Sequence, residues 1–420
     1  MALIVQKFGG TSVASPDRIR AAAGRVARAR AGGDRVVVVI SAMGDTTDHL
    51  LSLAGAVAPR SAHSRRREVD QLLATGEQAA SALVALALEE RGVPAISLTG
   101  IQAGILTDGS HSVARIRRIR ARRLGAEVRQ GRVPVVAGFQ GQSRGLEVTT
   151  LGRGGSDTTG VALAVAMGAD RCDIYTDVDG IYSADPRTVP GARRHHRLRH
   201  REALLLTLAG AAVLHPRAAA LAAEHRLPLR VLSSAEPVDH EHGTLIEGDA
   251  VMEGPRILGV AEAVDSARLR LERFTDGVSA TAGVLSALAA ADIPVEHLDH
   301  GRLPDGTPRL DIIVPGERTD EARAAVGELL GDGVRVDVST VARVTVVGTG
   351  LSSCGAPLGL ALQQLAEDGI EPDALGFSDL GLTLYLPPDH AARASVILHD
   401  ALLGDLFDAA VKPEPRRRSA

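Results

Sequence analysis

Two kinds of segment alternate along residues 1–235: short runs of β-branched residues and longer Ala/Leu/Arg-rich stretches with helical spacing. This alternation is typical of helices packed on a mainly parallel sheet. The first helix is predicted over residues 16–31, with Ser15 as its cap and Gly32 and Gly33 at its end. The β-branched runs predict strands at residues 3–6, 36–40, 133–137, 172–176 and 229–232.

The pattern changes after residues 233–254, which lose the alternation and are rich in Gly and Pro, as a connection between domains is. Two stretches then each have the order strand, helix, strand, strand, helix, and a final strand is clear only in the first, at 334–338. A small α+β unit is therefore repeated. The predicted organisation is an α/β domain over 1–245, α+β domains over 257–340 and 341–403, and a tail over 404–420.

Composition narrows the class of partner. A net charge of −4 and 2% aromatic residues disfavour a nucleic-acid surface, which needs basic charge and stacking rings. Cys172 and Cys354 lie far apart with no Cys-x-x-Cys motif, so they indicate neither a disulfide framework nor a zinc site. Residues 1–6 lack the features of an export signal or a membrane anchor. We expect a cytoplasmic protein that binds a metabolite, with no nucleic acid and no membrane as partner.

Lys7 stands out because it and Lys412 are the lysines among 47 basic residues. It ends the first predicted strand, and Gly9 and Gly10 follow it before a capped helix. Backbone N–H groups of such a turn can point at an anion, and a lysine adds a compact positive charge. The segment predicts a phosphate site.

Three further segments carry polar chemistry. In Gly152–Asp157, Ser156 is the predicted cap of the next helix, Arg153 offers a fork for a carboxylate, and Asp157 is expected to orient a lysine or a metal. Ser41–Asp48 follows a strand, where α/β sheets bind ligands, and its hydroxyls suit a polar substrate. Tyr175–Arg187 has the character of a nucleotide loop; it lacks the glutamate that a calcium loop requires at its twelfth position.

The segments Lys7–Ser12, Gly152–Asp157 and Tyr175–Arg187, in this order, resemble the three signatures of bacterial aspartate kinases. The similarity covers the whole chain. It implies a three-layer amino-acid-kinase domain with a mainly parallel sheet, followed by two ACT-type regulatory domains, the second degenerate. The implied reaction transfers the γ-phosphoryl group of ATP to L-aspartate, giving 4-phospho-L-aspartate for lysine and threonine biosynthesis. The implied assembly is a homodimer or higher homo-oligomer formed through the ACT domains.

The resemblance also implies residue roles. Lys7 would neutralise charge on the transferring phosphoryl group, and Asp157 would position the lysine. Arg153 and Glu77 would hold the carboxylate and ammonium of aspartate, with Thr47 beside them. Mg²⁺ would bridge the phosphates, with no metal site made by the protein alone. The implied ATP contacts are Lys7, Phe8, Gly9, Gly10, Ser41, Ser156, Thr176, Asp177, Tyr182, Asp185 and Arg187.

The chain departs from the family in the kinase half at two places. Ala212 stands where a Gly-Ala-Lys-Val segment has a lysine that reaches ATP, and Gln78 stands where an Arg commonly follows the glutamate. Loss of a charged hydrogen bond costs about 1.5–3 kcal/mol. Three outcomes stay open: Arg217 or another arginine substitutes, ATP binds weakly, or the chain is no longer a competent kinase.

The regulatory half departs more. Thr275–Val278 replaces a Pro-Gly turn, Asp299 and His300 replace a Gln-Asn pair, and Gly376–Leu380 replaces a Ser-Thr-Ser-Glu-Ile run. The residues near a bound amino acid have therefore changed, and we expect weakened feedback by lysine and threonine. Asp276 and Asp299 are the candidate contacts for a different effector.

Two alternatives to an aspartate kinase remain. One is a kinase of the same fold acting on glutamate, N-acetylglutamate or a nucleotide, which the Arg153 and Glu77 segments disfavour. The other is a catalytically silent amino-acid-binding regulatory paralogue, motivated by Ala212 and the altered regulatory segments. Met252 also raises the alternative of an internal start that produces a separate small subunit, but a chance methionine in the connection between domains is the favoured explanation.

Overall fold

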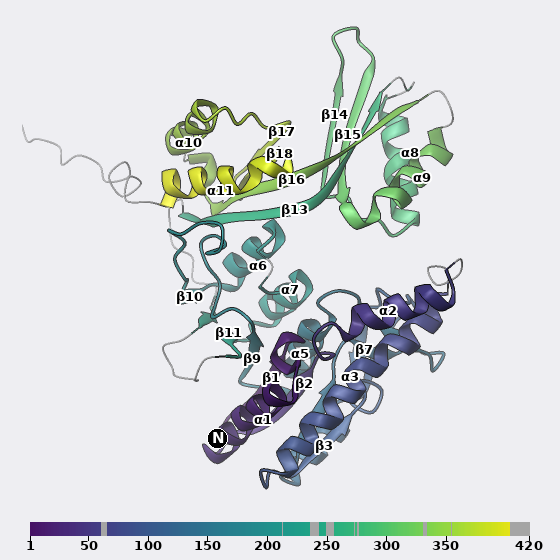
Figure 1. Cartoon of the computed structure of the whole chain (residues 1–420), viewed down its shortest axis with the longest axis vertical. Helices are drawn as coiled ribbons and strands as arrows, with labels where there is room; N and C mark the ends of the chain where they lie inside the picture. The colour runs from purple at the N-terminus through teal and green to yellow at the C-terminus, as the bar shows by residue number, and fades with distance from the viewer. Residues whose placement is uncertain are drawn as a thin grey trace, which may run out of the picture. The chain divides into compact units, whose positions relative to one another are not determined.

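The chain forms two compact units in a computed structural model that describes residues 1–59, 65–211, 213–235, 243–248, 256–272, 274, 277–330, 334–353 and 355–403 (Figure 1). The first unit comprises Met1–Tyr182, Arg194–Leu208 and Ala212–Met252. The second comprises Ser183–Arg193, Ala209–Ala211 and Glu253–Ala420. Five residues named above lie outside the described residues: Ala212, Met252, Thr275, Asp276 and Cys354. The predicted tail lies outside them too.

An eight-stranded sheet forms the centre of the first unit, in the order β10-β12-β11-β9-β1-β2-β6-β3. Its pairings are parallel except the antiparallel β11–β12 pair, as helix-covered sheets of this class generally are. All the strands predicted for this part are confirmed. The bounds are β1 Leu3–Phe8, β2 Arg35–Ile40, β3 Ala95–Leu98, β6 Val133–Ala137, β9 Arg171–Thr176, β10 Arg197–Leu198, β11 Leu229–Ser233 and β12 Thr244–Ile246.

Helices cover both faces of this sheet. α1 (Pro16–Ala31) and α3 (Arg66–Glu89) share one apolar core with Phe8 and with alternate residues of β2 and β6. The predicted start and end of α1 are confirmed, because Ser15 Oγ accepts from Arg18 N at 3.3 Å and Gly33 has a φ of +91°. The other helices are α2 Thr46–Val57, α4 Arg122–Arg129, α5 Gly155–Met167, α6 His200–Ala209 and α7 Pro216–His225.

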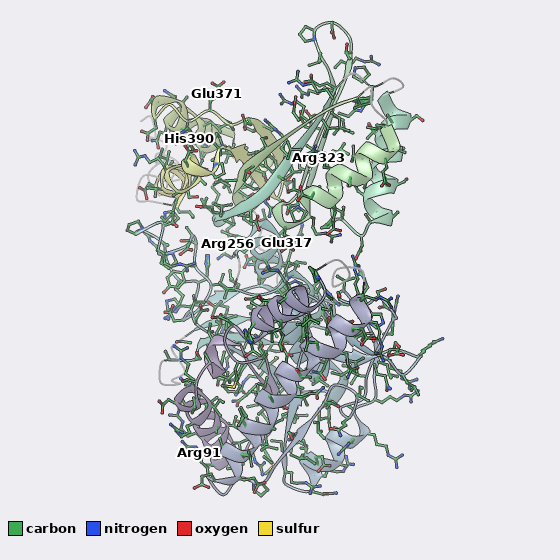
Figure 2. The ribbon with its side chains drawn as sticks, turned by 45° about the vertical axis from the view of Figure 1, so that its right-hand side comes forward. Arg91, Arg256, Glu317, Arg323, Glu371 and His390 are labelled. Carbon is green, nitrogen blue, oxygen red and sulfur yellow. The ribbon has the colours of Figure 1, made fainter. Side chains whose placement is uncertain are left out.

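α3 is the longest helix among the described residues and carries two buried carboxylates, Asp70 and Glu77. By length and composition alone it would be able to cross a membrane. Its inward face packs against α1 and the sheet, which is the ordinary environment of a core helix. Arg91, labelled in Figure 2, follows α3 and donates to Arg20 O of α1 at 3.1 Å, which ties the two helices together.

A second, four-stranded sheet in the first unit has the order β5-β4-β7-β8. Its strands are very short, so the sequence pattern did not reveal them. β8 leads directly into the glycine-rich segment before α5, and the sheet thereby places that segment. The bounds are β4 Ile105–Thr107, β5 Ile116–Ile119, β7 Gln140–Gln142 and β8 Val148–Thr150.

The second unit is built on one antiparallel six-stranded sheet, in the order β14-β15-β13-β16-β18-β17. Two separate apolar cores lie on it: α8 and α9 cover one, and α10 and α11 cover the other. The bounds are β13 Arg256–Glu272, α8 Gly277–Ala290, β14 His297–Arg302, β15 Pro308–Pro315, α9 Thr319–Leu330, β16 Arg335–Thr349, α10 Gly355–Glu367, β17 Ala374–Ser378, β18 Gly381–Leu386 and α11 Pro388–Leu403.

β13 and β16 are long enough to run through both cores. The first half of β13 pairs with the second half of β16, and Ile257 and Val260 pack in the core that otherwise belongs to residues 342–402. The second repeat lacks a final strand in its own sequence. The first half of β13, which precedes the first repeat's helices, takes that place in its core. The predicted boundary between residues 340 and 341 falls inside strand β16. The limits 257–340 and 341–403 therefore divide the sequence repeats and do not mark a break between two structural domains.

Candidate active site

A cavity of about 490 Å³ lies in the first unit at the carboxyl ends of β1 and β2, beside the first turn of α5. Open α/β sheets bind ligands at this edge. The cavity gathers residues that are far apart in sequence, from β1, α2, α3 and the segment before α5. The predicted site residues that line it are Lys7, Gly10, Ser41, Thr47, Glu77, Arg153, Ser156 and Asp157.

Lys7 and Asp157 form an ion pair at one end of this cavity, with 2.6 Å between Lys7 Nζ and Asp157 Oδ1. Side chains alternate along β1, so Phe8 faces the core shared with α1 while Lys7 faces α5. A Cβ added at Gly160 of α5 would lie 3.2 Å from Lys7 Cβ, and one added at Gly9 would lie 3.4 Å from Lys7 Nζ. The lysine stem is therefore packed along its length, and its ammonium group is held at the cavity.

The turn after Lys7 is fixed by close backbone contacts. Gly9 N donates to Tyr175 O at 3.1 Å, and Gly44 N donates to Gly10 O at 3.0 Å. A Cβ at Gly10 would lie 2.9 Å from Ala42 O, so this position requires glycine. The segment around Ser41 and the segment after Lys7 therefore pack against each other, as a compact phosphate-binding site requires.

Phe8 differs from the other residues of this turn. Its side chain is fully buried and stacks on the ring of Tyr175, with 4.6 Å between the centroids. The structure therefore turns the Phe8 ring toward the core and away from the cavity. Phe8 supports the turn, and a nucleotide contact from this residue is open only to its backbone.

The helix after the second glycine-rich segment is not capped by Ser156, and that prediction is wrong. α5 begins at Gly155, and its N-cap is Gly154 in the left-handed region, with a φ of +66°. A side chain at Gly154 would overlap the ring of His215. The N-cap is therefore a glycine two residues before the serine that the cap pattern indicated. Ser156 is left within the first helical turn, buried and lining the cavity.

Glu77, which also lines the cavity, is 3% exposed and accepts a hydrogen bond from Ala42 N at 3.1 Å through Oε1. Its Oε2 has no hydrogen-bond partner among the described residues. Burial raises the pKa of Glu77 to about 7, while the hydrogen bond from Ala42 opposes this shift. Thr47 and the exposed Arg153 line the same cavity. A carboxylate and a guanidinium around one cavity suit a small zwitterion.

The sequence did not point to Asp70, Ser112, Phe139, Thr150 or His215, although Ser112, Phe139 and Thr150 line the cavity. The sequence did contain one indication for Asp70. It precedes Glu77 by about two helical turns, so the two carboxylates were predictable as lying on the same face of α3. Phe139 adopts a φ of +66°, a strained backbone for an aromatic residue and of a kind that clusters at functional sites. No sequence pattern predicts such a conformation.

Arg217 was one candidate substitute for the lysine that Ala212 replaces. Its guanidinium donates to Leu151 O at 2.6 Å and to Ala114 O at 3.0 Å. Burial lowers the pKa of Arg217. The side chain therefore holds the segment that carries Arg153, and it does not line the cavity. Gln78, the other departure, donates to Gln140 Oε1 at 3.2 Å.

The predicted nucleotide loop is held by its own polar pairs. Thr176 Oγ1 donates to Asp177 Oδ1 at 2.9 Å, and Tyr182 OH donates to Asp179 at 2.9 Å. Asp185 and Arg187 pair at 2.7 Å, and they belong to a segment that groups with the second unit. None of these residues lines the described cavity. The ATP contacts assigned to Thr176, Asp177, Tyr182, Asp185 and Arg187 stay predictions.

The candidate effector residues of the second unit are engaged with neighbours. Asp299 pairs with Arg309 at 2.7 Å, and Arg309 also reaches Asp311 at 3.0 Å. His300 Nδ1 lies 2.9 Å from Thr281 Oγ1 in the first turn of α8, and its ring would lie 2.9 Å from a Cβ at Gly277. The space where α8 begins is thus filled by a side chain of the same chain.

A model of the amino acid kinase family matches residues 2–233, more than half of the chain. The eight-stranded sheet apart from β12, the glycine-rich turn after Lys7 and the cavity all lie within these residues. The chain belongs to the amino acid kinase family.

Full-length relatives narrow the class. Aspartokinase 2 of Bacillus subtilis is 40% identical over 406 residues, covering 96% of this chain and 98% of the relative. An aspartate kinase of Pseudomonas putida is 39% identical over 412 residues, covering 96% and 97%. The crystal structure of Escherichia coli aspartokinase III with aspartate and ADP superposes with a TM-score of 0.80 at 26% identity, covering 96% of this chain and 100% of that one. The resemblance to aspartate kinases and the predicted fold class are confirmed.

Proposed function

We propose that the cavity holds L-aspartate between Glu77 and Arg153 and the γ-phosphoryl group of ATP beside Lys7. The arrangement of charge supports this assignment, since a carboxylate and a guanidinium line one part of the cavity and a buried ammonium lines another. Arg153 offers two parallel N–H donors to the substrate carboxylate. Glu77 offers its unpartnered Oε2 to the substrate ammonium, with Thr47 alongside.

The reaction needs little covalent chemistry from the protein. A side-chain carboxylate of aspartate is ionised at neutral pH, so its oxygen attacks the γ-phosphorus without a general base. A phosphorus–oxygen bond to aspartate forms while the bond from the γ-phosphorus to the bridging oxygen of ADP breaks. The products are 4-phospho-L-aspartate and ADP. Catalysis then reduces to in-line positioning and stabilisation of charge on the transferring group.

Lys7 is the residue that we assign to this charge. Its ammonium group is fixed by the packed stem and by Asp157, so no reorganisation accompanies phosphoryl transfer. Gly10 and the first turn of α5 around Ser156 contribute backbone N–H groups and the positive end of a helix dipole, whereas the N–H of Gly9 is already donated to Tyr175 O. The buried Lys7–Asp157 pair at the edge of the cavity is the single observation that best supports a phosphotransferase site.

We further propose that Mg²⁺ enters bound to the nucleotide. Among the described residues, no group of three or more His, Cys, Asp or Glu side chains is placed to hold a metal. Mg²⁺ commonly keeps waters and takes one or two carboxylates together with substrate phosphates, which fits a site with Asp157 as its carboxylate. When bound, Mg²⁺ neutralises phosphate charge.

Trapping with hydroxylamine tests the proposed function. The purified chain is incubated with aspartate, ATP and Mg²⁺, and aspartyl hydroxamate is measured beside a Lys7→Ala variant. The proposal predicts hydroxamate that depends on both substrates and is lost in the variant. Hydroxamate no higher than in the variant would favour the catalytically silent paralogue. Product with glutamate but not aspartate would favour the other kinase of this fold.

Weakened feedback by lysine and threonine also belongs to this proposal. The contact between His300 and Thr281 and the pairing of Asp299 with Arg309 support it, because groups that would meet an amino acid effector are already engaged. We also propose a cytoplasmic homo-oligomer, formed through the second unit. The relatives and the sequence composition are consistent with both.

A further inference from the structure

Asp70 is a fully buried carboxylate that the proposed mechanism does not use. It lies on α3 and makes an unusual number of hydrogen bonds. It accepts from Thr150 N at 3.0 Å and Thr150 Oγ1 at 2.6 Å. It also accepts from Ser112 N at 3.0 Å and Ser112 Oγ at 3.3 Å, and His111 Nδ1 lies 2.8 Å from Oδ2. One side chain thus joins three segments that are distant in sequence.

These hydrogen bonds hold the start of the segment that carries Arg153. Thr150 is the last residue of β8, three positions before Arg153. Ser112 is held with a φ of +69°, which is costly for a residue other than glycine, and its carbonyl oxygen would lie 3.0 Å from a Cβ at Gly152. Ala114 N donates to Thr150 O at 2.9 Å. The loop around Ser112 is therefore pressed against the start of the Arg153 segment, and Asp70 holds both.

Asp70 also has a fixed relation to Glu77. The two residues are seven positions apart on α3, close to two full turns, so they share a face. Glu77 lines the cavity, and so do Ser112, Thr150 and Arg153. The bonds from Asp70 are therefore a direct and fully buried polar link between the helix that carries Glu77 and the segment that carries Arg153.

We propose that Asp70 is a positioning residue for the amino acid substrate. It sets the spacing between Glu77 and Arg153, so that both charged groups on the α-carbon of aspartate are met at once. This inference rests on the proposed roles of Glu77 and Arg153. Asp70 has no bond to Lys7, Asp157 or the turn after β1 among the contacts of the described residues, so its effect falls on aspartate and not on ATP.

An Asp70→Asn variant tests the proposal because an amide keeps the size and removes one acceptor oxygen. Each oxygen of Asp70 accepts hydrogen bonds from at least two donors. In the variant one of these oxygens becomes an NH₂ group, so in either orientation of the amide at least two donors lose their acceptor. We expect the KM for aspartate to rise about tenfold or more, the cost of a lost charged hydrogen bond. We expect kcat to fall less and the KM for ATP to stay within about twofold.

Asp173→Asn is the matched control, since Asp173 is equally buried and pairs with Arg171 and Arg230 at 3.1 Å and 2.7 Å. Neither of these partners lines the cavity, whereas the partners Ser112 and Thr150 of Asp70 do. A merely structural role for Asp70 predicts that both variants behave alike. The proposal is overturned if Asp70→Asn leaves the KM for aspartate unchanged, if it raises both KM values equally, or if the Asp173 variant gives the same selective rise.

A second variant decides the question if Asp70→Asn does not fold. His111→Ala removes one outer donor to Asp70 from a side chain that is 21% exposed and does not line the cavity. We expect a rise of about threefold in the KM for aspartate, with the KM for ATP unchanged. No change in the KM for aspartate would overturn the proposal. Absence of hydroxamate from the unsubstituted protein is a separate result, which contradicts the proposed function and this inference with it.

Discussion

The two units of this chain use charged side chains in opposite ways. In the first unit, Lys7, Glu77 and Arg153 line a cavity, and Glu77 keeps an oxygen without a hydrogen-bond partner among the described residues. In the second unit, Asp299 and Arg309 pair with each other, and His300 reaches the first turn of α8. Glu77 Oε2 therefore has hydrogen-bonding capacity left for a ligand, whereas the Asp299 and His300 side chains are occupied by partners of the same chain. The comparison is in line with the proposed catalysis in the first unit and with the proposed weakening of feedback in the second.

The largest expected effect comes from replacing Lys7 by arginine. The lysine stem is packed against Gly160 and its ammonium lies close to Gly9, so a planar guanidinium cannot occupy the same space. We expect Lys7→Arg to lower kcat by about 10² to 10³, the usual cost of losing a preorganised charge-stabilising group. Rates of hydroxamate formation measure this directly.

Lys412→Arg is the matched control for Lys7→Arg, because it makes the same exchange at the other lysine of the chain. We expect it to leave kcat unchanged. A Lys7→Arg enzyme with near-normal kcat would show that the site needs only a positive charge and not the geometry of a lysine. The contrast drawn between the two units would then no longer be supported by Lys7.

A smaller effect is expected from pH. Burial raises the pKa of Glu77 to about 7, so protons compete with the substrate ammonium below that pH. We expect the KM for aspartate to rise as pH falls below 7, approaching about tenfold per pH unit well below the pKa. Steady-state rates between pH 5.5 and 8.5 check this, with Glu77→Gln as the control that lacks the titration. A flat profile would contradict the assignment of Glu77 to the ammonium.

The same carboxyl group should reduce stability. Its folded-state pKa lies above the ordinary value of 4.5, so the folded chain binds more protons than the unfolded chain between about pH 4.5 and 7. The free energy of unfolding therefore falls as pH rises through this window. Glutamine does not ionise, so the Glu77→Gln variant avoids the cost of burying a charged carboxylate. We expect its free energy of unfolding to exceed that of the unsubstituted chain by about 1–3 kcal/mol at pH 8. The difference should shrink toward pH 5, as urea unfolding would reveal.

The smallest expected effect is that of the amino acids that inhibit related enzymes. Initial rates with millimolar lysine, threonine or both should change by less than about twofold, because an effector acts only through contacts that differ between states. Strong concerted inhibition would contradict the inference from His300 and Asp299. A His300→Ala variant that gained inhibition would sharpen it, since that change empties the space beside Thr281.

The strands, the first helix and the main site segments were predictable because each depends on neighbours in sequence. The turn after Lys7 and the segment around Arg153 each follow a strand and precede a helix, and the structure brings both to one cavity. Contacts between distant residues were not predictable. The bonds of Asp70 to Ser112 and Thr150, and the overlap that demands glycine at 154, exist only once the chain has folded.

The regulatory half illustrates the same limit at larger scale. The repeat of strands and helices was visible in sequence, while the exchange of a strand between repeats was not. β13 and β16 each serve two cores, and nothing in the hydrophobic pattern of a single strand says which core it completes. Alternation along β1 predicts that Lys7 and Phe8 face opposite sides of the sheet, but not which side holds the cavity. That depends on the strands and helices packed around β1, which place Phe8 in the core and Lys7 at the cavity.

The most direct test of the central claim is acceptor-dependent phosphoryl transfer by the purified full chain. ATP, Mg²⁺ and hydroxylamine are supplied with aspartate, with glutamate or with N-acetylglutamate, and hydroxamate and ADP are quantified together. We predict equal amounts of hydroxamate and ADP with aspartate, and neither above background with the other two acceptors or in Lys7→Ala. Equal background signals for the chain and for Lys7→Ala with aspartate would contradict it.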